Sequence, residues 1–213
     1  MRLMQNILAA AALALIASPC WAYYEVLDTG EVLKRGQHRL TGGVQAMTEH
    51  GGTNITGMFD TGIQEDFGLR GLVGFGNTDY YFGGLVKWVP IPDVDNQPAI
   101  GADTGIVYAK WDDATEFTFK FDPMISKKLP VGEAFITPYL ALPIGLRFHD
   151  SHIRGIDNTT QMTLAVAGGG QLQVPAWKNL QFMAEVGVNL DHSFSYVSAA
   201  AVFYFDNEGF RFE

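Results

Sequence analysis

The sequence predicts an all-β fold, a single antiparallel up-and-down transmembrane β-barrel of about ten strands. Segments of about ten residues alternate between apolar and polar side chains, and each is followed by a turn rich in Gly, Asn, Asp or Pro. Charged residues make up 17% of the chain, against roughly 25% in ordinary soluble domains, and aromatic residues make up 13%. A surface so poor in charge indicates that much of it does not face water.

The first element is a secretory signal peptide over residues 1–22. MRLMQN is followed by the short apolar core ILAAAALALIA and by SPCWA, in which Cys20 is the third residue back from the expected cut and occupies a small-residue position. We expect cleavage after Ala22, so the mature chain begins at Tyr23 and contains no cysteine. The alternative is a lipid anchor on Cys20, which the preceding Pro19 disfavours.

The mature chain is divided into three parts. Residues 23–37 form a lead-in that is either an N-terminal strand or a loose segment, residues 38–206 form the barrel, and residues 207–213 form a tail. The ten predicted strands are 38–48, 54–64, 67–77, 80–88, 98–110, 115–125, 134–148, 159–174, 180–191 and 194–205. They are separated in order by HGGT, QED, NTD, PDVDNQ, DDAT, KKLPVGE, HDSHIRGIDN, AWKN and DHS, which are typical hairpin connections.

Each strand has one apolar parity, which we assign to the outside. In QMTLAVAGGGQLQV, for example, Met162, Leu164 and Val166 alternate with small or polar residues. We predict in particular that lipid contacts Ile144, Leu164, Val166, Phe182 and Val186. The assignment extends to the last strand, where it places on the outside Phe194, Tyr196, Ala200, Val202 and Tyr204.

The opposite parity is polar but also rich in Gly, Ala, Gln and Thr. A soluble barrel would instead present long Lys and Glu side chains there. A narrow membrane barrel needs small residues inside and paired charges. The predicted strands also match the roughly 9 to 11 residues that a tilted strand needs to cross a bilayer. A membrane barrel is therefore favoured over a soluble, lipocalin-like periplasmic carrier, whose Gly-x-Trp motif is missing from the sequence.

Aromatic residues near the predicted turns support the same interpretation, because their rings favour the lipid headgroup region. These residues are Tyr80, Tyr81, Trp88, Tyr108, Trp111, Phe148, Trp177, Tyr196 and Tyr204.

At the level of pattern, the chain resembles the small outer-membrane β-barrel proteins of Gram-negative bacteria, the broad OmpA-like and OmpW-like class. The resemblance rests on the signal peptide, the alternating strands, ITPYLALPIGLRF over 136–148 and the aromatic-rich AAAVFYF over 199–205. It implies an outer-membrane location, contact with outer-membrane lipid and insertion by the barrel-assembly machinery. The chain departs from the class after Phe205, where DNEGFRFE ends on Glu213 rather than on an aromatic residue.

A catalytic pair is the enzymatic alternative. His149 and Ser151 are two residues apart on a predicted strand and could act as base and nucleophile. They resemble the His-x-Ser pair of outer-membrane lipid A deacylases, although His152 stands where that motif has Asn. A polar external loop explains the same residues without catalysis, so we expect no enzyme here and keep a lipid-modifying hydrolase as the alternative.

Metal and cofactor sites are not indicated. Asp150 and Asp157 accompany the two histidines of this loop, but spacing within a loop fixes no coordination geometry. Asp191, His192 and Ser193 are consecutive, cannot converge on one another and mark a turn. The formal net charge is -9 and no run of Lys or Arg occurs, which argues against nucleic-acid binding.

The remaining candidate is a network of charges inside the lumen. Nine charged residues share the polar parity: Arg70, Lys87, Lys120, Arg147, Asp60, Asp103, Glu116, Asp122 and Glu185. Because an unpaired charge in a narrow barrel would cost several kcal/mol, we expect the cations to pair with some of the acids. The sequence therefore predicts a structural barrel or a narrow, porin-like pore for small solutes.

Overall fold

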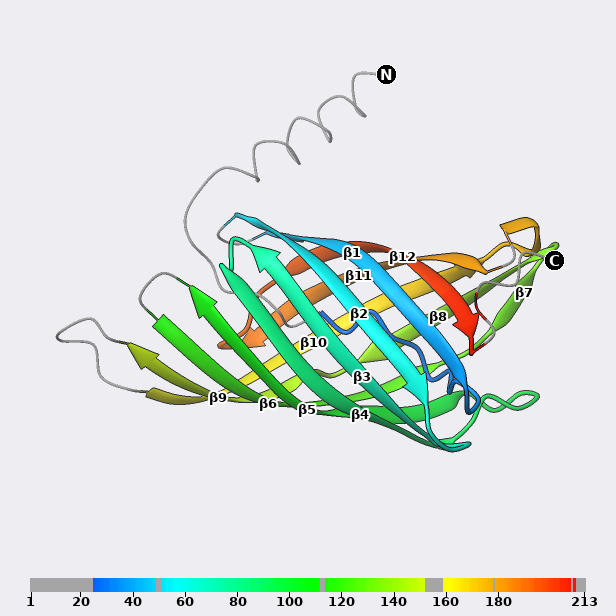
Figure 1. The fold of residues 1–213 in the computed structure, drawn as a ribbon, viewed down its shortest axis with the longest axis horizontal. Coiled ribbons are helices and arrows are strands. Elements are labelled where there is room, and N and C mark those ends of the chain that lie inside the picture. The colour runs from blue at the N-terminus through cyan, green and yellow to red at the C-terminus, as the bar shows by residue number, and fades with distance from the viewer. Residues whose placement is uncertain are drawn as a thin grey trace, which may run out of the picture.

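The computed structural model describes residues 25–48, 51–111, 114–151, 159–177, 179–207 and 209, and it is a closed antiparallel barrel (Figure 1). Neighbouring crossings are β1 (Gln37–Met47), β2 (Thr53–Gly62), β3 (Phe67–Gly76), β4 (Tyr80–Ile91), β5 (Ala99–Trp111), β6 (Ala114–Ser126), the pair β8 (Ala134–Ala141) and β9 (Ile144–Ser151), β10 (Thr159–Gln173), β11 (Leu180–Asp191) and β12 (Tyr196–Asp206). β1 pairs with β12 from Gln37 opposite Asp206 to Met47 opposite Tyr196, which closes the ring. The predicted all-β, ten-stranded barrel is confirmed.

The seventh crossing is interrupted. β8 and β9 both pair with β6 and with β10, and only Leu142 and Pro143 separate them. Proline has no backbone N–H to donate to the ladder, which accounts for the break inside the single strand predicted over 134–148. A short strand, β7 (Leu129–Val131), extends the β8 hairpin beyond the ring.

We call the end at which β1 begins and β12 ends the near end of the barrel, and the opposite end the far end. The hairpins β2–β3, β4–β5, β6–β8 and β10–β11 turn at the near end, where Pro175–Trp177 also form a short 3-10 turn. Among the described residues no helix is long and apolar enough to cross a membrane.

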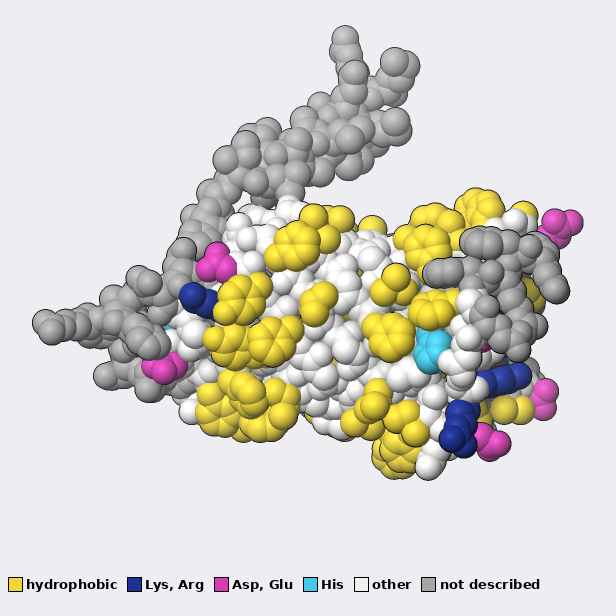
Figure 2. All heavy atoms as spheres, in the orientation of Figure 1, with side chains coloured by type: hydrophobic (Ala, Val, Ile, Leu, Met, Phe, Trp, Pro, Cys, Tyr) yellow, Lys and Arg dark blue, Asp and Glu magenta, His cyan; other side chains and the backbone are white. Residues whose placement is uncertain are grey.

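The outer surface of the ring is apolar. Met162 is 58% exposed and Val186 51% exposed, whereas Ala165, which has the opposite parity to Met162 on β10, is 1% exposed. Figure 2 shows the large apolar side chains of this surface in two bands, one toward each end. Tyr80 and Tyr108 belong to the far band, with ring centroids 6.3 Å apart. An apolar belt with aromatic borders is the surface that a bilayer requires of a barrel.

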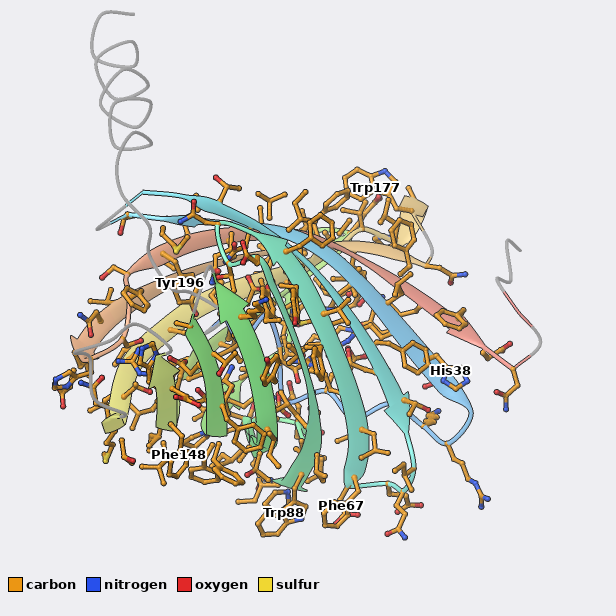
Figure 3. All side chains as sticks on the ribbon, turned by 60° about the vertical axis from the view of Figure 1, so that its left-hand side comes forward. His38, Phe67, Trp88, Phe148, Trp177 and Tyr196 are labelled. Atoms are coloured by element: carbon orange, nitrogen blue, oxygen red, sulfur yellow. The ribbon has the colours of Figure 1, made fainter. Side chains whose placement is uncertain are left out.

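The near band contains the stacked rings of Phe67 and Trp88, 6.1 Å apart and on neighbouring strands (Figure 3). Trp177 packs edge-on against Phe182 at the same end. The five residues predicted to contact lipid have the outward parity: Ile144, Leu164, Val166, Phe182 and Val186.

The assignment of the last strand is wrong. Tyr196, Ala200 and Val202 are buried inside the barrel, whereas Val197 is 46% and Phe203 39% exposed. In YVSAAAVFYFD both parities are apolar apart from Ser198 and the terminal Asp206, so hydrophobicity does not distinguish the two faces. A strand read one residue out of phase presents every side chain to the wrong face.

Two further tyrosines that were predicted at the lipid interface lie inside the barrel instead. Tyr81 is 2% exposed and lies inside the barrel, and the hydroxyl of Tyr204 bonds to luminal Glu31 and Gln171. Of the other predicted ring residues, Tyr80, Trp88, Phe148 and Trp177 are exposed on the outer surface. The side chain of Trp111 lies outside the described residues.

Candidate functional site

The lumen contains the chain's own N-terminal segment. Residues 25–33, which we call the luminal segment, run inside the ring toward the near end and then join β1 (Figure 1). Leu27 and Asp28 are completely buried. Residues 25–33 form no strand, and their backbone lies in the lumen. Gly62 permits its close passage, because a Cβ there would lie 2.1 Å from the carbonyl oxygen of Leu33.

Asp28 is the centre of the charge network. Its carboxylate lies 2.7 Å from Arg39, 2.9 Å from Arg70 and 2.9 Å from Lys87, measured between the charged atoms. These cations project from β1, β3 and β4, so one acid joins the luminal segment to three strands. A buried carboxylate requires such compensation, since desolvation would otherwise exclude its charged form.

Glu185 holds the backbone of the same segment. Its two carboxylate oxygens accept hydrogen bonds from the N–H groups of Val26 at 2.9 Å and Leu27 at 2.8 Å. They also accept bonds from the hydroxyls of Tyr139 at 2.6 Å and Tyr196 at 2.7 Å. Glu185, on β11, thereby satisfies two backbone donors that the segment would otherwise bury unpaired.

The segment's remaining polar groups are held in the same way. Tyr81 and Ser198 donate to the carboxylate of Glu25, and Lys120 donates to its carbonyl oxygen. Arg70 donates to the carbonyl of Val26 at 2.9 Å. Donors on the wall therefore face acceptors on the luminal segment. The acceptor Glu185, also on the wall, faces backbone N–H donors of the segment.

Several residues of the predicted charge network lie side by side on the wall. Arg70 is 2.7 Å from Asp60 and 3.3 Å from Asp103. Lys120 is 3.2 Å from Asp122, and Arg147 is 3.5 Å from Glu116 toward the far end. Lys87 pairs with Asp28 of the luminal segment. Glu185 accepts hydrogen bonds from backbone N–H groups and tyrosine hydroxyls and pairs with no cation among the described residues.

The sequence reasoning missed three members of the network: Glu25, Asp28 and Arg39. Arg39 has the polar parity of its strand, which is the signal that places it in the lumen. Glu25 and Asp28 lie before the first strand, where no alternation assigns a face. Their occurrence in EVLDTGEVL, between apolar residues, was a signal that the segment is partly buried.

Beside the luminal segment, apolar side chains fill the middle of the interior. Met58, Leu72, Leu85, Val107 and Met183 are buried and belong to one apolar cluster that includes Leu27.

The residues of the catalytic alternative are only partly described. His149 projects inward from β9, with Nδ1 4.0 Å from a carboxylate oxygen of Glu116. The side chain of Ser151, together with His152 and Asp157, lies outside the described residues. In the part of the chain that the structure describes, no group of three or more His, Cys, Asp or Glu residues is placed to hold a metal ion.

Comparison with known proteins adds to this description. No protein-family model matches the chain, and no curated protein matches it. Among solved structures it is similar to a designed transmembrane β-barrel, with 15% identity, a TM-score of 0.41 and coverage of 82% of this chain and 100% of the other. The N-terminal β-barrel domain of Pseudomonas aeruginosa OprF has 8% identity, a TM-score of 0.39 and coverage of 81% and 100%. Ail, the attachment invasion locus protein of Yersinia pestis, has 12% identity, a TM-score of 0.33 and coverage of 80% and 99%.

Proposed function

We propose that this protein is an outer-membrane β-barrel with a structural role, closed to solutes by its luminal segment. The observation that carries the proposal is the burial of residues 25–29 inside the ring, each at most 4% exposed. Contacts with Arg39, Arg70, Lys87 and Glu185 hold the segment from several sides. A solute would have to displace it together with these paired charges.

The charges of the wall support closure rather than conduction. The strands of the wall carry five inward cations (Arg39, Arg70, Lys87, Lys120 and Arg147) and five inward acids (Asp60, Asp103, Glu116, Asp122 and Glu185), and ion pairs such as Arg39 with Asp60 and Lys120 with Asp122 join members of the two sets. A ring of like charges, which would attract one kind of ion, is the arrangement expected of a selective pore. The outer-membrane location follows from the apolar belt together with the predicted signal peptide.

The test is the conductance of single proteins in a planar bilayer. The chain from Tyr23 to the end, refolded in detergent, is compared with a variant that starts at Lys34 and lacks the luminal segment. We expect the longer chain to be nearly silent and the shorter chain to conduct about tenfold more or higher, because the same ring then encloses a polar gap.

A second variant guards against misfolding of the truncated chain. Leu27→Gly in the longer chain keeps Glu25 and Asp28 but removes an apolar side chain from the packed interior, and it should give small, brief openings. Steady conductance by the unaltered chain would overturn closure and support the narrow, small-solute pore. Equal silence of all three folded proteins would show that the segment is not what closes the lumen.

A further inference from the structure

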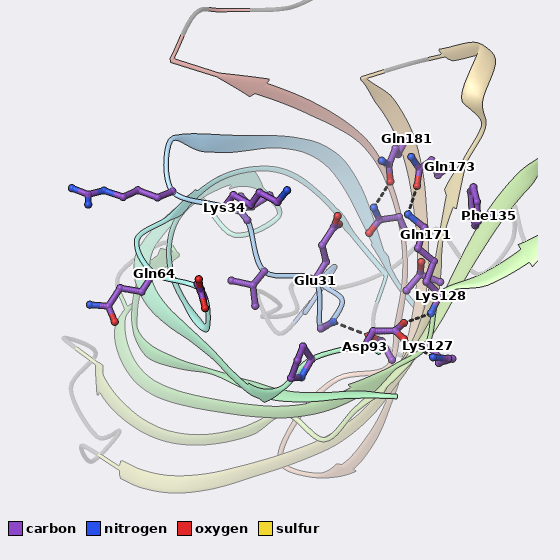
Figure 4. A pocket seen from close by; sticks show the side chains of 18 of the residues that line it. Glu31, Lys34, Gln64, Asp93, Lys127, Lys128, Phe135, Gln171, Gln173 and Gln181 are labelled. Carbon is purple, nitrogen blue, oxygen red and sulfur yellow. Dashed lines mark hydrogen bonds and ion pairs between the residues drawn. The ribbon is translucent and has the colours of Figure 1, made fainter. Parts of the chain in front are cut away.

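The near end of the barrel contains a cavity of about 1180 Å³. Its floor is the last part of the luminal segment, including Glu31 and Leu33 (Figure 4). The cavity is therefore open at the near end and blocked toward the middle of the lumen. Its size exceeds the roughly 300 to 1,000 Å³ typical of small-molecule sites. A dead-ended recess of this kind suits binding rather than passage.

One wall of the recess is made of neutral polar side chains. Gln171 and Gln173 project from β10, Gln181 from β11 and Thr137 from β8, all toward the cavity. Strand pairing places Gln173 opposite Gln181 and Gln171 opposite Thr137, so the four groups form one continuous surface. Amides and hydroxyls both donate and accept hydrogen bonds, as do the hydroxyl groups of a sugar.

The charges around the recess balance. Its lining has four basic residues (Lys34, Arg35, Lys127 and Lys128) and four acidic residues (Glu31, Glu65, Asp93 and Asp95). Lys127 is 2.5 Å from Asp93, and Lys128 donates to Gln173 at 2.7 Å while its ammonium lies 4.8 Å above the ring of Phe135. Glu31 accepts a bond from Tyr204. The recess therefore has no net charge with which to select a strongly charged ligand.

One buried acceptor indicates what the ligand must supply. Gln171 is 4% exposed, and its amide nitrogen donates to Gln181 and to Tyr204. Its oxygen Oε1 accepts no hydrogen bond from the described residues, and Figure 4 shows the side chain directed into the mouth of the barrel. A buried acceptor without a donor is unfavourable, so a ligand in the recess gains by turning this amide toward itself and donating to its oxygen. Phosphate dianions and carboxylates have no hydrogen to donate, whereas hydroxyl groups do.

We infer that this recess is a binding site for a neutral oligosaccharide, with Gln171, Gln173, Gln181 and Thr137 as its polar wall. The saccharide donates a hydroxyl hydrogen to Gln171 Oε1 and exchanges further bonds with the other amides. The site rests on the luminal segment being seated in the barrel, because that segment is its floor, and not on the amount of conductance that remains.

The test is saturation-transfer NMR on the detergent-folded protein, with maltotriose, cellotriose and chitotriose as probes. We expect at least one of them to receive saturation. Gln171→Met should lower the transfer about fivefold or more, since it removes the amide but keeps the length of the side chain. Gln161→Met is the matched control, because Gln161 lies on the same strand with the same parity as Gln171 but toward the far end, away from the recess, and it should leave the transfer unchanged.

Thr137→Val keeps the shape of the wall and removes one hydroxyl, so it should also reduce the saturation transfer. It replaces Gln171→Met as the test variant if that variant does not fold. Spermidine and glucose 6-phosphate test the charged alternatives. The inference is overturned if no trisaccharide receives saturation, if the wall variants leave the signal intact, or if a charged probe displaces the sugar.

Discussion

Three tyrosine rings inside the barrel each cover a glycine directly opposite on the neighbouring strand. The pairs are Gly74 with Tyr81, Gly169 with Tyr139 and Gly187 with Tyr196. A Cβ at these glycines would lie 2.1, 2.5 and 2.1 Å from ring atoms of the respective tyrosine. The absence of a side chain is what lets each ring lie flat on the wall, from which two of them reach Glu185.

Gly187→Ala should therefore destabilise the protein. The added methyl group would force Tyr196 away from Glu185, and overpacking of this kind costs about 1–3 kcal/mol. Gly42→Ala is the matched control, because Gly42 is also in mid-strand but a Cβ there would meet nothing within 4 Å. Unfolding in urea, followed by tryptophan fluorescence, measures both variants, and equal midpoints would contradict the argument.

Glu185→Gln tests the hold on the luminal segment. An amide keeps one acceptor oxygen, but its NH₂ group would face one backbone N–H donor and one tyrosine hydroxyl, either Val26 with Tyr196 or Leu27 with Tyr139. A buried donor without its partner costs about 1–3 kcal/mol, so the segment should detach more often. A cysteine placed at Thr29 should then react faster with a water-soluble maleimide than in the parent protein. Glu133→Gln, in the exposed turn before β8, should leave that rate unchanged.

At the scale of the elements, alternation was enough to predict ten crossings and most of their faces. Strands such as β11 have a clear apolar parity, so their bounds, 180–191, agree with the prediction. The faces of β12 were assigned wrongly, because both of its parities are apolar; what distinguishes them is the fit of Tyr196 against Gly187 and Glu185 on β11. The luminal segment was also beyond such reasoning, because its position depends on wall groups that bond its backbone rather than on its own pattern.

A hydrogen-bonded contact joins the β4–β5 turn to the β6–β7 turn at the near end. Lys127 contacts one oxygen of Asp93, and the N–H of Lys128 donates to the other at 2.6 Å. Partial burial alone would raise the pKa of Asp93, but the hydrogen bonds from Lys127 and Lys128 outweigh it and lower the pKa. A carboxyl with a lowered pKa stabilises the folded state above its unfolded pKa, and this contribution is lost as the pH falls through the folded value.

The contact should accordingly persist down to mildly acidic pH and be lost only below about 4, the region of an ordinary aspartate pKa. A carbon-detected NMR titration of the Asp93 carboxyl measures this midpoint. Lys127→Ala should move the midpoint up toward the ordinary value, because it removes one of the two donors. A midpoint that stays the same in Lys127→Ala would show that the contact does not form in solution.

For the whole molecule, the decisive question is which surface meets lipid. Nitroxide labels placed singly at Leu164 and Phe203, in protein reconstituted into bilayers, should be relaxed by oxygen, which concentrates in lipid. A label at Gln173, which lines the recess at the near end, should be relaxed by a water-soluble nickel chelate instead. The reverse pattern would mean that the apolar side is inside and the barrel is soluble.

The contacts that hold the luminal segment also have a consequence for the order of folding. The partners of Asp28 are Arg39, Arg70 and Lys87, all on the first four strands, whereas Glu185 and the β1–β12 seam need the last ones. Contacts between residues near in sequence form with less loss of chain entropy than distant ones. The early strands can therefore capture the segment while the sheet is still open. The late strands then wrap around a chain that is already seated, and threading through a finished ring is unnecessary.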